Sequence, residues 1–244
     1  MQGGILKDLE KILFLKKVES TQDVSKDWIR KYNFSPVIVA SEQTKGRGQR
    51  NSLWQSYKGG LWFSLSLKNF STFKDTLLPL MCSYAVLKSI ENLTLYPMIK
   101  WPNDVMLLYK KVAGILIEKF NFNGEVYHIC GFGINVNNEI NIENIRYPAI
   151  NLKSILKREI NVNMLLFNIL ENFEKILENF SDIFFDTILK DINNKLFLKN
   201  EFIKIEKQNK IVYNAILDSI GSEGELIYIL NGKYYSLFSG RIIF

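Results

Sequence analysis

Four short segments of this 244-residue chain combine glycines with cationic, amide or carboxylate side chains, as a site for an anionic ligand requires. The first is the loop at residues 44–54, where Lys45, Arg47 and Arg50 surround two glycines. Glycine lets backbone N–H groups and guanidinium groups come close to phosphate or carboxylate oxygens. The loop lacks the third glycine of a dinucleotide-binding motif and the Gly-Lys-Ser/Thr end of a P-loop. It therefore predicts anion binding, with a plain surface loop as the alternative.

The second segment, Lys100 to Asp104, places a cation, an aromatic ring, an amide and a carboxylate around one proline at the end of an expected strand. Polar groups gathered at a strand end, next to apolar segments, are typical of a ligand site in an α/β arrangement. The alternative is an Asn-Asp turn with Trp101 in the core.

Two further segments are strand-like stretches interrupted by glycines. Lys111 precedes the apolar residues 112–118, in which Gly114 contributes no packing of its own. A glycine inside a strand indicates the close approach of a ligand or of another backbone. The stretch Gly131 to Asn137 is the last of the four, and a β-bulge or a bend is the alternative there.

The composition excludes several classes of site. A single histidine, His128, leaves too few members for histidine-based triads or zinc clusters, and Cys82 and Cys130 lie in apolar segments, as buried thiols do. The 31 Lys and Arg against 25 Asp and Glu give a net charge of +6, which suits an anionic ligand, an acidic protein or nucleic acid alike. No stretch of about 18 uncharged apolar residues suggests a membrane span, and charges interrupt residues 1–15, so we expect a cytoplasmic protein without a signal peptide.

The elements that would position these segments follow from hydrophobic periodicity. Strands are expected at residues 36–40, 61–67, 98–101, 105–109, 112–119 and 126–136, with turns at 102–104, 110–111 and 123–124. Helices are expected at residues 20–31, with Ser20 or Thr21 as N-cap, at 77–90, and as one long or two consecutive helices over 163–190. Short strands at 202–206, 211–217, 225–230 and 234–238 indicate a small β-barrel. The prediction is an α+β fold with a mixed β-sheet flanked by helices over residues 1–198 and the barrel over 199–244.

In their order and spacing, the four segments resemble the motifs of the biotin protein ligase family. Lys100 to Asp104 matches Lys-Trp-Pro-Asn-Asp in full, and Lys111 to Glu118 matches Lys-x-Ala-Gly-Ile-Leu-x-Glu. The last segment resembles Gly-x-Gly-Ile-Asn-x-Asn, and Ser20 to Gln22 resembles a Ser-Thr-Asn element. The resemblance runs from Glu19 through the terminal barrel and implies a class II synthetase-like catalytic domain followed by an SH3-like barrel.

The chain departs from the family pattern in two places. The family loop commonly reads Gly-Arg-Gly-Arg-x-Gly-Arg-x-Trp, whereas here Gln49, Asn51 and Ser52 replace an arginine, a glycine and another arginine. Retention of an adenylate by this loop is therefore in question, and Arg50 is the residue expected to supply part of the missing charge. The residues before Glu19 are also too few for the winged helix-turn-helix of some members, so the chain resembles the short, non-regulatory form.

The resemblance implies that ATP and biotin react to biotinyl-5′-AMP and pyrophosphate, after which biotin passes to a lysine of a biotin carboxyl carrier protein. Lys111 and Arg47 are the implied catalytic residues, because they would offset the repulsion between the biotin carboxylate and the α-phosphate. The implied biotin-binding residues are Ser20, Thr21, Gln22, Gln43, Arg47, Gly48, Gln49, Lys111, Gly114 and Ile115. The implied ATP-binding residues are Arg50, Trp54, Lys100, Asn103, Asp104, Lys111 and Asn135, with Trp54 over the adenine and Asp104 as a candidate Mg²⁺ ligand.

Two other readings remain open at this stage. A lipoate ligase or another acyl-adenylate ligase would share the fold and the chemistry but has a different glycine loop. A nucleic-acid-binding protein without enzymatic activity would rest only on the net charge and the small barrel. The ligase reading further predicts no specific DNA binding and no membrane association, and it allows a homodimer.

Overall fold

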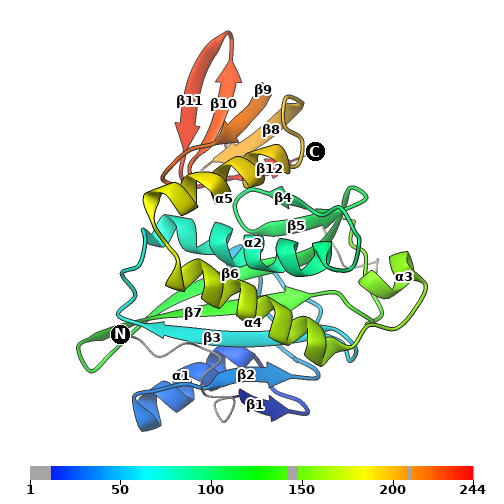
Figure 1. Cartoon of the computed structure of the whole chain (residues 1–244), viewed down its shortest axis with the longest axis vertical. Helices are drawn as coiled ribbons and strands as arrows, with labels where there is room; N and C mark the ends of the chain where they lie inside the picture. The colour runs from blue at the N-terminus through cyan, green and yellow to red at the C-terminus, as the bar shows by residue number, and fades with distance from the viewer. Residues whose placement is uncertain (1–11, 142–147, 208–209, 244) are drawn as a thin grey trace.

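The computed structural model describes residues 12–141, 148–207 and 210–243, which form two sheets (Figure 1). The larger is a mixed sheet of seven strands in the order β1-β2-β3-β7-β6-β5-β4. Only β1 and β2 are parallel; the other neighbours are antiparallel. Its strands are β1 (Ile12–Leu15), β2 (Val37–Ala40), β3 (Leu61–Lys68), β4 (Met98–Lys100), β5 (Asp104–Leu107), β6 (Lys110–Phe122) and β7 (Glu125–Ile134). The expectation about a signal peptide concerns residues 1–15, which lie mostly outside the described ranges.

The two faces of the large sheet are covered differently, as strand β7 shows. Because side chains alternate along a strand, Phe132 reaches the face covered by α2 (Leu78–Glu91) and α4 (Val162–Glu178), where it packs edge-on against Phe173. Tyr127 and Ile129 reach the other face and pack with Ile29 of α1 (Thr21–Tyr32). Gly131 and the following glycine continue this second face beyond α1, which leaves room there for a site.

The helices begin and end largely where the sequence indicates. Ser20 is the N-cap of α1, as expected, although its side chain makes no capping hydrogen bond. The apolar stretch over residues 163–190 forms two consecutive helices, α4 and α5 (Asp182–Asn194). The Ser181 side chain caps α5 by accepting a hydrogen bond from the backbone of Phe184. None of the described helices is both long and apolar enough to cross a membrane.

The turn expected at residues 110–111 was placed wrongly. The chain turns at Leu108 and Tyr109, both with positive φ, and Lys110 already belongs to β6. Such a two-residue turn usually carries Asn or Gly, so its sequence gave no signal. The Tyr109 ring instead packs against Phe197 in the tertiary structure. The consequence is functional, because Lys111 lies within a paired strand instead of in a loop.

Five short elements were not predicted from the sequence, since they are too short for a periodicity to be recognised. They are β1, α3 (Leu152–Leu156), β12 (Arg241–Ile243) and the 3-10 helices η2 (Gln49–Asn51) and η3 (Asp75–Leu77). The second sheet lies where the small barrel was expected and has the strand order β11-β10-β9-β8-β12. Its other strands are β8 (Phe202–Lys207), β9 (Lys210–Ile220), β10 (Leu226–Leu230) and β11 (Lys233–Leu237). All its pairings are antiparallel.

The two sheets share one hydrophobic core. Ile203, Ile205 and Leu217 of the small sheet belong to the same buried cluster as the residues between the large sheet and its helices. The buried Trp101 also donates a hydrogen bond from Nε1 to the carbonyl of Gly224, at 2.9 Å. The C-terminal sheet is therefore packed directly against the strand end that carries the second segment. The division of the chain at residues 198 and 199 stays a prediction.

Candidate active site

A cavity of about 510 Å³ brings the four segments together on the α1 side of the large sheet. Every residue that the sequence analysis assigned to biotin or to ATP lines it: Ser20, Thr21, Gln22, Gln43, Arg47, Gly48, Gln49, Arg50, Trp54, Lys100, Asn103, Asp104, Lys111, Gly114, Ile115 and Asn135. The lining also includes Gly131, Gly133, Glu206 and Arg241, to which no ligand had been assigned. The volume is in the range of cavities that hold small organic ligands.

Glycines form the floor of this cavity. Gly114 and Gly133 are direct cross-strand partners on β6 and β7. A Cβ atom on Gly133 would lie 2.5 Å from Nε1 of Trp54, and one on Gly114 would lie 2.9 Å from Nζ of Lys111. The glycines are needed because the indole and the ammonium group lie directly on the sheet. The pairings of β7 run without a register shift, so the alternative of a bulge at residues 131–134 is wrong.

Trp54 is held in the cavity with an unsatisfied donor. Its Nε1 is buried and has no hydrogen-bond partner among the described residues. Buried N–H groups without an acceptor are rare in folded proteins. Nε1 faces Gly133 on the sheet, so a ligand in the cavity would reach this donor only if the indole ring moved.

Lys111 and Lys100 share the carboxylate of Asp104. Nζ of Lys111 lies 2.6 Å from Oδ1 of Asp104, and Nζ of Lys100 lies 4.0 Å from Oδ2. Nζ of Lys111 also lies 4.8 Å from the centre of the Trp54 ring, within cation–π range. Two ammonium groups beside one carboxylate leave a net positive charge, and Lys100 is only 4% exposed. A phosphate group would find this charge partly desolvated, where it acts more strongly than in water.

The backbone holds these charges in place. Lys100 and Asp104 are cross-strand partners on β4 and β5, joined through a cis peptide bond between Trp101 and Pro102. The Lys111 backbone is bonded on a second side as well, from its N–H to the carbonyl of Pro148 at 2.8 Å. The proline turn and the β6 start thus place both lysines at one end of the cavity.

Two buried asparagines are fixed next to the lysines. The Asn103 side chain donates a hydrogen bond to the carbonyl of Ile115, and the Asn138 side chain donates one to Oδ1 of Asn135 at 3.1 Å. The Ile115 side chain belongs to the hydrophobic core between the large sheet and its helices, so it mainly contributes to packing.

The opposite end of the cavity is polar and uncharged. Two glutamine amides contribute to it, and Oε1 of Gln43 accepts from the backbone and the hydroxyl of Thr21, at 2.9 and 3.1 Å. Nε2 of Gln43 donates to the hydroxyl of Ser56 at 2.8 Å. Gln22 donates from Nε2 to the carbonyls of Leu116 and, at 3.4 Å, Ile129. These bonds orient the amides for a neutral polar ligand group.

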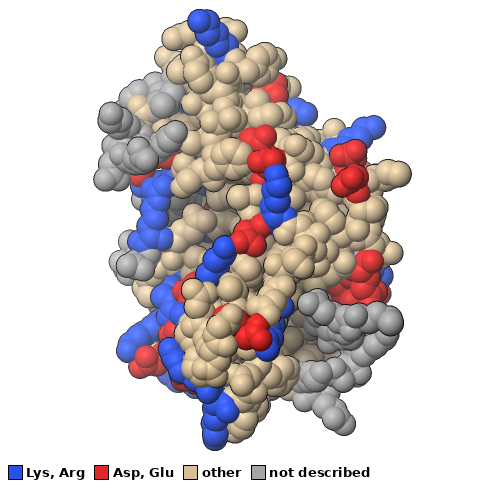
Figure 2. Space-filling view, turned by 90° about the vertical axis from the view of Figure 1, so that its left-hand side faces the viewer, with Lys and Arg blue, Asp and Glu red and all other residues tan. Residues whose placement is uncertain are grey.

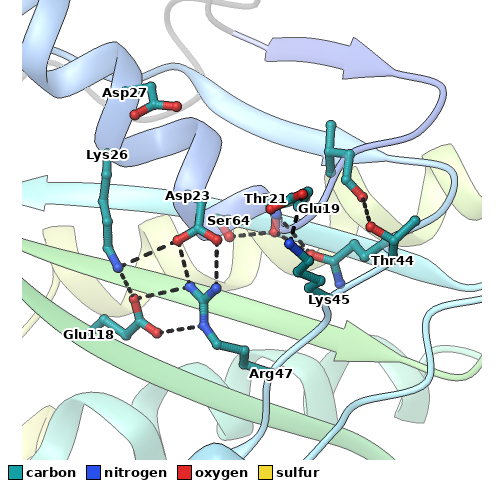
Figure 3. Close-up of polar contacts among 12 residues, drawn as sticks. Glu19, Thr21, Asp23, Lys26, Asp27, Thr44, Lys45, Arg47, Ser64 and Glu118 are labelled. Carbon is teal, nitrogen blue, oxygen red and sulfur yellow. Dashed lines mark hydrogen bonds and ion pairs between the residues drawn. The ribbon is translucent and has the colours of Figure 1, made fainter.

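Arg47 is neutralised by acidic residues that the sequence analysis did not assign to the site (Figure 3). It donates to both carboxylate oxygens of Asp23, at 2.6 and 2.9 Å, and to Glu118 at 3.2 Å. Lys26 joins the cluster through Glu118 at 2.6 Å. Glu118 lies inside a recognised motif, whereas Asp23 lies in the first turn of α1, outside all four segments. The expected contact of Arg47 with a ligand carboxylate would require Arg47 to share or exchange these partners.

Within this cluster, the contact between Arg47 and Asp23 shifts the pKa of both residues. Hydrogen bonding to Asp23 raises the pKa of Arg47 above its ordinary value, despite partial burial. Burial by itself would raise the pKa of Asp23, but the hydrogen bond and the charge of Arg47, together with Lys26, outweigh it and hold that pKa below the ordinary value. The pair of Arg47 and Asp23 therefore remains ionised at neutral pH.

Direct metal binding is not favoured by the side chains present. Among residues 12–141, 148–207 and 210–243, no group of three or more His, Cys, Asp or Glu side chains could hold a metal ion. Asp104 offers a single carboxylate, and Lys111 already occupies one of its oxygens. The geometry fits Asp104 better as the residue that orients Lys111; its role as a Mg²⁺ ligand stays a prediction.

The C-terminal sheet adds a second charged set to the cavity wall. Glu206 of β8 accepts hydrogen bonds from Arg241 of β12 and, at 3.1 Å, from Arg50 of the glycine loop. The sequence offered no signal for this set, because Arg50 and Glu206 are 156 residues apart.

On the face drawn in Figure 2, basic and acidic side chains are interspersed, without one broad basic patch of the kind that binds a nucleic-acid backbone.

Residues 14–137 match the sequence model of the Biotin/lipoate A/B protein ligase family, and this stretch contains most of the cavity lining. The bifunctional ligase/repressor BirA of Bacillus subtilis is 39% identical over 109 residues, which are 43% of this chain and 34% of that protein. Biotin–protein ligase 2 of Arabidopsis thaliana is 28% identical over 228 residues, which are 87% of this chain and 67% of that protein. The match thus spans about a third of the first relative and two thirds of the second.

A solved structure resembles the whole described fold. The biotin protein ligase from Aquifex aeolicus in complex with biotin and ATP has a TM-score of 0.81 to this chain at 28% identity. The alignment covers 96% of this chain and 98% of that chain, so the likeness includes both sheets.

Proposed function

The chain belongs to the biotin/lipoate A/B protein ligase family, and from this premise we propose that it is an ATP-dependent biotin protein ligase. In the proposed reaction a carboxylate oxygen of biotin attacks the α-phosphorus of ATP. The bond to pyrophosphate breaks, and biotinyl-5′-AMP forms. The amine of an acceptor lysine then attacks the acyl carbon, which forms an amide and releases AMP. The observation that carries this proposal is the Lys111–Asp104 pair, which lies on a glycine floor in a cavity of sufficient size.

Lys111 is the proposed catalytic residue of the first step. Two anions must approach each other, and negative charge grows on the phosphate oxygens in the transition state. A positioned ammonium group stabilises that charge without reorganisation, because Asp104 and the Trp54 ring already hold it. The buried Lys100 adds charge at the same end. We expect Mg²⁺ to enter as part of the substrate, bound to the ATP phosphates.

Biotin would then occupy the cavity between the neutral amides and Lys111. Thr21, Gln22 and Gln43 supply donors and acceptors for the ureido ring, and Gly131 leaves room beside the Gln22 amide, which a Cβ would approach to 2.9 Å. The nucleotide would occupy the end with Trp54, Asn103 and Asn135. Gln49 and Gly48 would lie over the junction of the two ligands.

Pyrophosphate release tests this proposal. Purified protein with ATP should release pyrophosphate when biotin is added, and transfer should label a biotin carboxyl carrier domain but not the same domain with its acceptor lysine replaced by arginine. Lipoate in place of biotin should give little release. A preference for lipoate would establish the other activity of this family, and no release with either acid would contradict ligase activity.

The remaining expectations concern the acceptor protein, the oligomeric state, DNA binding and the location in the cell. The biotin carboxyl carrier protein as acceptor follows from the proposed activity. A homodimer, the absence of specific DNA binding and a cytoplasmic location remain predictions.

A further inference from the structure

The C-terminal sheet contributes a buried carboxylate to the cavity wall. Glu206 on β8 is the cross-strand partner of Arg241 on β12 and is 8% exposed. Arg241 donates from Nε to Oε2 of Glu206 at 2.7 Å and from Nη2 to Oε1 at 2.6 Å. A bidentate contact of this kind fixes the orientation of the carboxylate as well as its charge.

The same carboxylate reaches the glycine loop. Nη1 of Arg50 lies 3.1 Å from Oε1 of Glu206. The Arg50 backbone is left-handed, at φ 56° and ψ 39°, a conformation that a non-glycine residue keeps only where its surroundings hold it. The contact with Glu206 is one such restraint, and it joins two parts of the chain that no strand pairing connects.

The charge of this set suits the nucleotide end of the cavity. Arg50 and Arg241 share one carboxylate, so the set has a net charge of +1, as does the lysine pair around Asp104. Arg47, by contrast, is neutralised by two carboxylates. A guanidinium group has five N–H donors, so Arg50 keeps donors beyond the one directed at Glu206.

We propose that Glu206, fixed by Arg241, is a positioning residue that holds Arg50 and thereby keeps the loop at residues 46–54 closed over biotinyl-AMP. The inference rests on the proposed function, because it concerns retention of the intermediate. It answers the question raised by Gln49, which stands where the family loop has an arginine. In this chain, Glu206 of the C-terminal sheet holds Arg50, the residue next to Gln49.

The rate at which biotinyl-AMP is released from the loaded enzyme tests this contact between Glu206 and Arg50, which we call the latch. Glu206→Gln removes the charge of the carboxylate but keeps its shape, and release should become about fivefold faster, since a partly exposed ion pair contributes modestly. Arg50→Ala should speed release at least as much, because it removes both the contact with Glu206 and the remaining donors of Arg50. In the Arg50→Ala background, Glu206→Gln should add nothing, because the contact is already absent.

Glu223→Gln is the matched control. The Lys74–Glu223 ion pair also joins the C-terminal sheet to the rest of the chain, but neither residue lines the cavity. Release should equal that of the wild type. Thermal unfolding of each variant identifies any loss of folding, and if Glu206→Gln does not fold, Arg50→Ala tests the contact from its exposed side.

The outcomes separate the latch from the function on which it rests. A wild-type protein that forms no biotinyl-AMP contradicts both. If the wild type forms biotinyl-AMP and Arg50→Ala releases it no faster than the wild type does, only the proposed role of the Arg50–Glu206 contact is refuted. Additive effects of the two substitutions would also refute it, since Glu206 would then act without Arg50.

Discussion

The ammonium group of Lys111 lies between an acid and an aromatic face, 2.6 Å from Oδ1 of Asp104 and 4.8 Å from the centre of the Trp54 ring. Its neighbour Lys110 lies on the same strand but is exposed and does not line the cavity. The two lysines therefore have the same local sequence context and different surroundings. The alternation of side chains along β6 separates them onto opposite faces.

Lys111→Ala should fold normally and slow adenylate formation by about a hundredfold or more, because a preorganised charge in the transition state is lost. Biotin-dependent release of pyrophosphate under single-turnover conditions measures the rate. Lys110→Ala is the control and should keep the wild-type rate. Equal rates for Lys111→Ala and the wild type would remove Lys111 from the catalytic role.

At the scale of elements, β7 supplies the floor and α1 supplies a wall. On the site face of β7, Gly131 lies under the Gln22 amide and Gly133 under the Trp54 indole. On α1, Asp23 holds Arg47 at the start of the glycine loop. Each contact depends on which face of the element its residue occupies.

Substitution of the two β7 glycines should affect the two substrates differently. Gly131→Ala should raise the KM for biotin by about tenfold, since its Cβ would approach Gln22 to 2.9 Å, and should change the KM for ATP less. Gly133→Ala should do the reverse, since its Cβ would lie 2.5 Å from the Trp54 indole. Each variant is the control for the other in steady-state kinetics. Identical effects on both substrates would contradict this division.

Asp23 should give the protein an acid-dependent contribution to stability. Its pKa is lowered in the folded state, so the contribution is present above the ordinary value of about 3.9 and is lost as the pH falls through the lower folded pKa. The free energy of unfolding should thus fall more steeply between about pH 5 and pH 3 in the wild type than in Asp23→Asn. Asp27→Asn, on the same helix and paired with Arg30, is the control for urea titrations. Parallel curves for Asp23→Asn and the wild type would count against this assignment.

At the scale of the whole molecule, both sheets contribute to one core and one cavity. The buried hydrogen bond from Trp101 to Gly224 joins the proline turn of the site to the C-terminal sheet. Trp62 makes a comparable bond to the carbonyl of Tyr57, at 3.0 Å, entirely within the first part of the chain. The two tryptophans allow the sheet contact to be tested against an internal bond.

Trp101→Phe should lower the free energy of unfolding by about 1–2 kcal/mol, since it leaves a buried carbonyl without its side-chain donor. Trp62→Phe should lower it less, because the carbonyl of Tyr57 is only partly buried and also accepts from the backbone N–H of Gly60. Only Trp101→Phe should speed amide hydrogen exchange in β10 under native conditions. Mass spectrometry of peptides from residues 225–230 measures the exchange. Equal protection of these peptides in both variants would mean that other contacts hold the small sheet.

Local patterns in the sequence were enough to predict the type of the longer elements and the residues that line the cavity. The helix Val162–Glu178 has a clear apolar period, because only one of its faces is buried. The strand Val37–Ala40 is instead a short continuous apolar stretch, because all four of its residues are buried. The glycine and lysine motifs were recognisable for the same reason: each lies within a few consecutive residues. Every ligand residue inferred from them lines the cavity.

Contacts between segments that are distant in the chain could be identified only from the folded structure. The turn at Leu108 and Tyr109 has no local signal, because both residues adopt a positive φ that their residue types do not favour. The Tyr109 ring packs against Phe197, which is distant in the chain. The pairing of Arg50 with Glu206 is likewise invisible in sequence, since charged residues are common and their partners depend on the docking of one sheet against another. Local patterns record burial and backbone preference, whereas the partner of a charge is set by the fold as a whole.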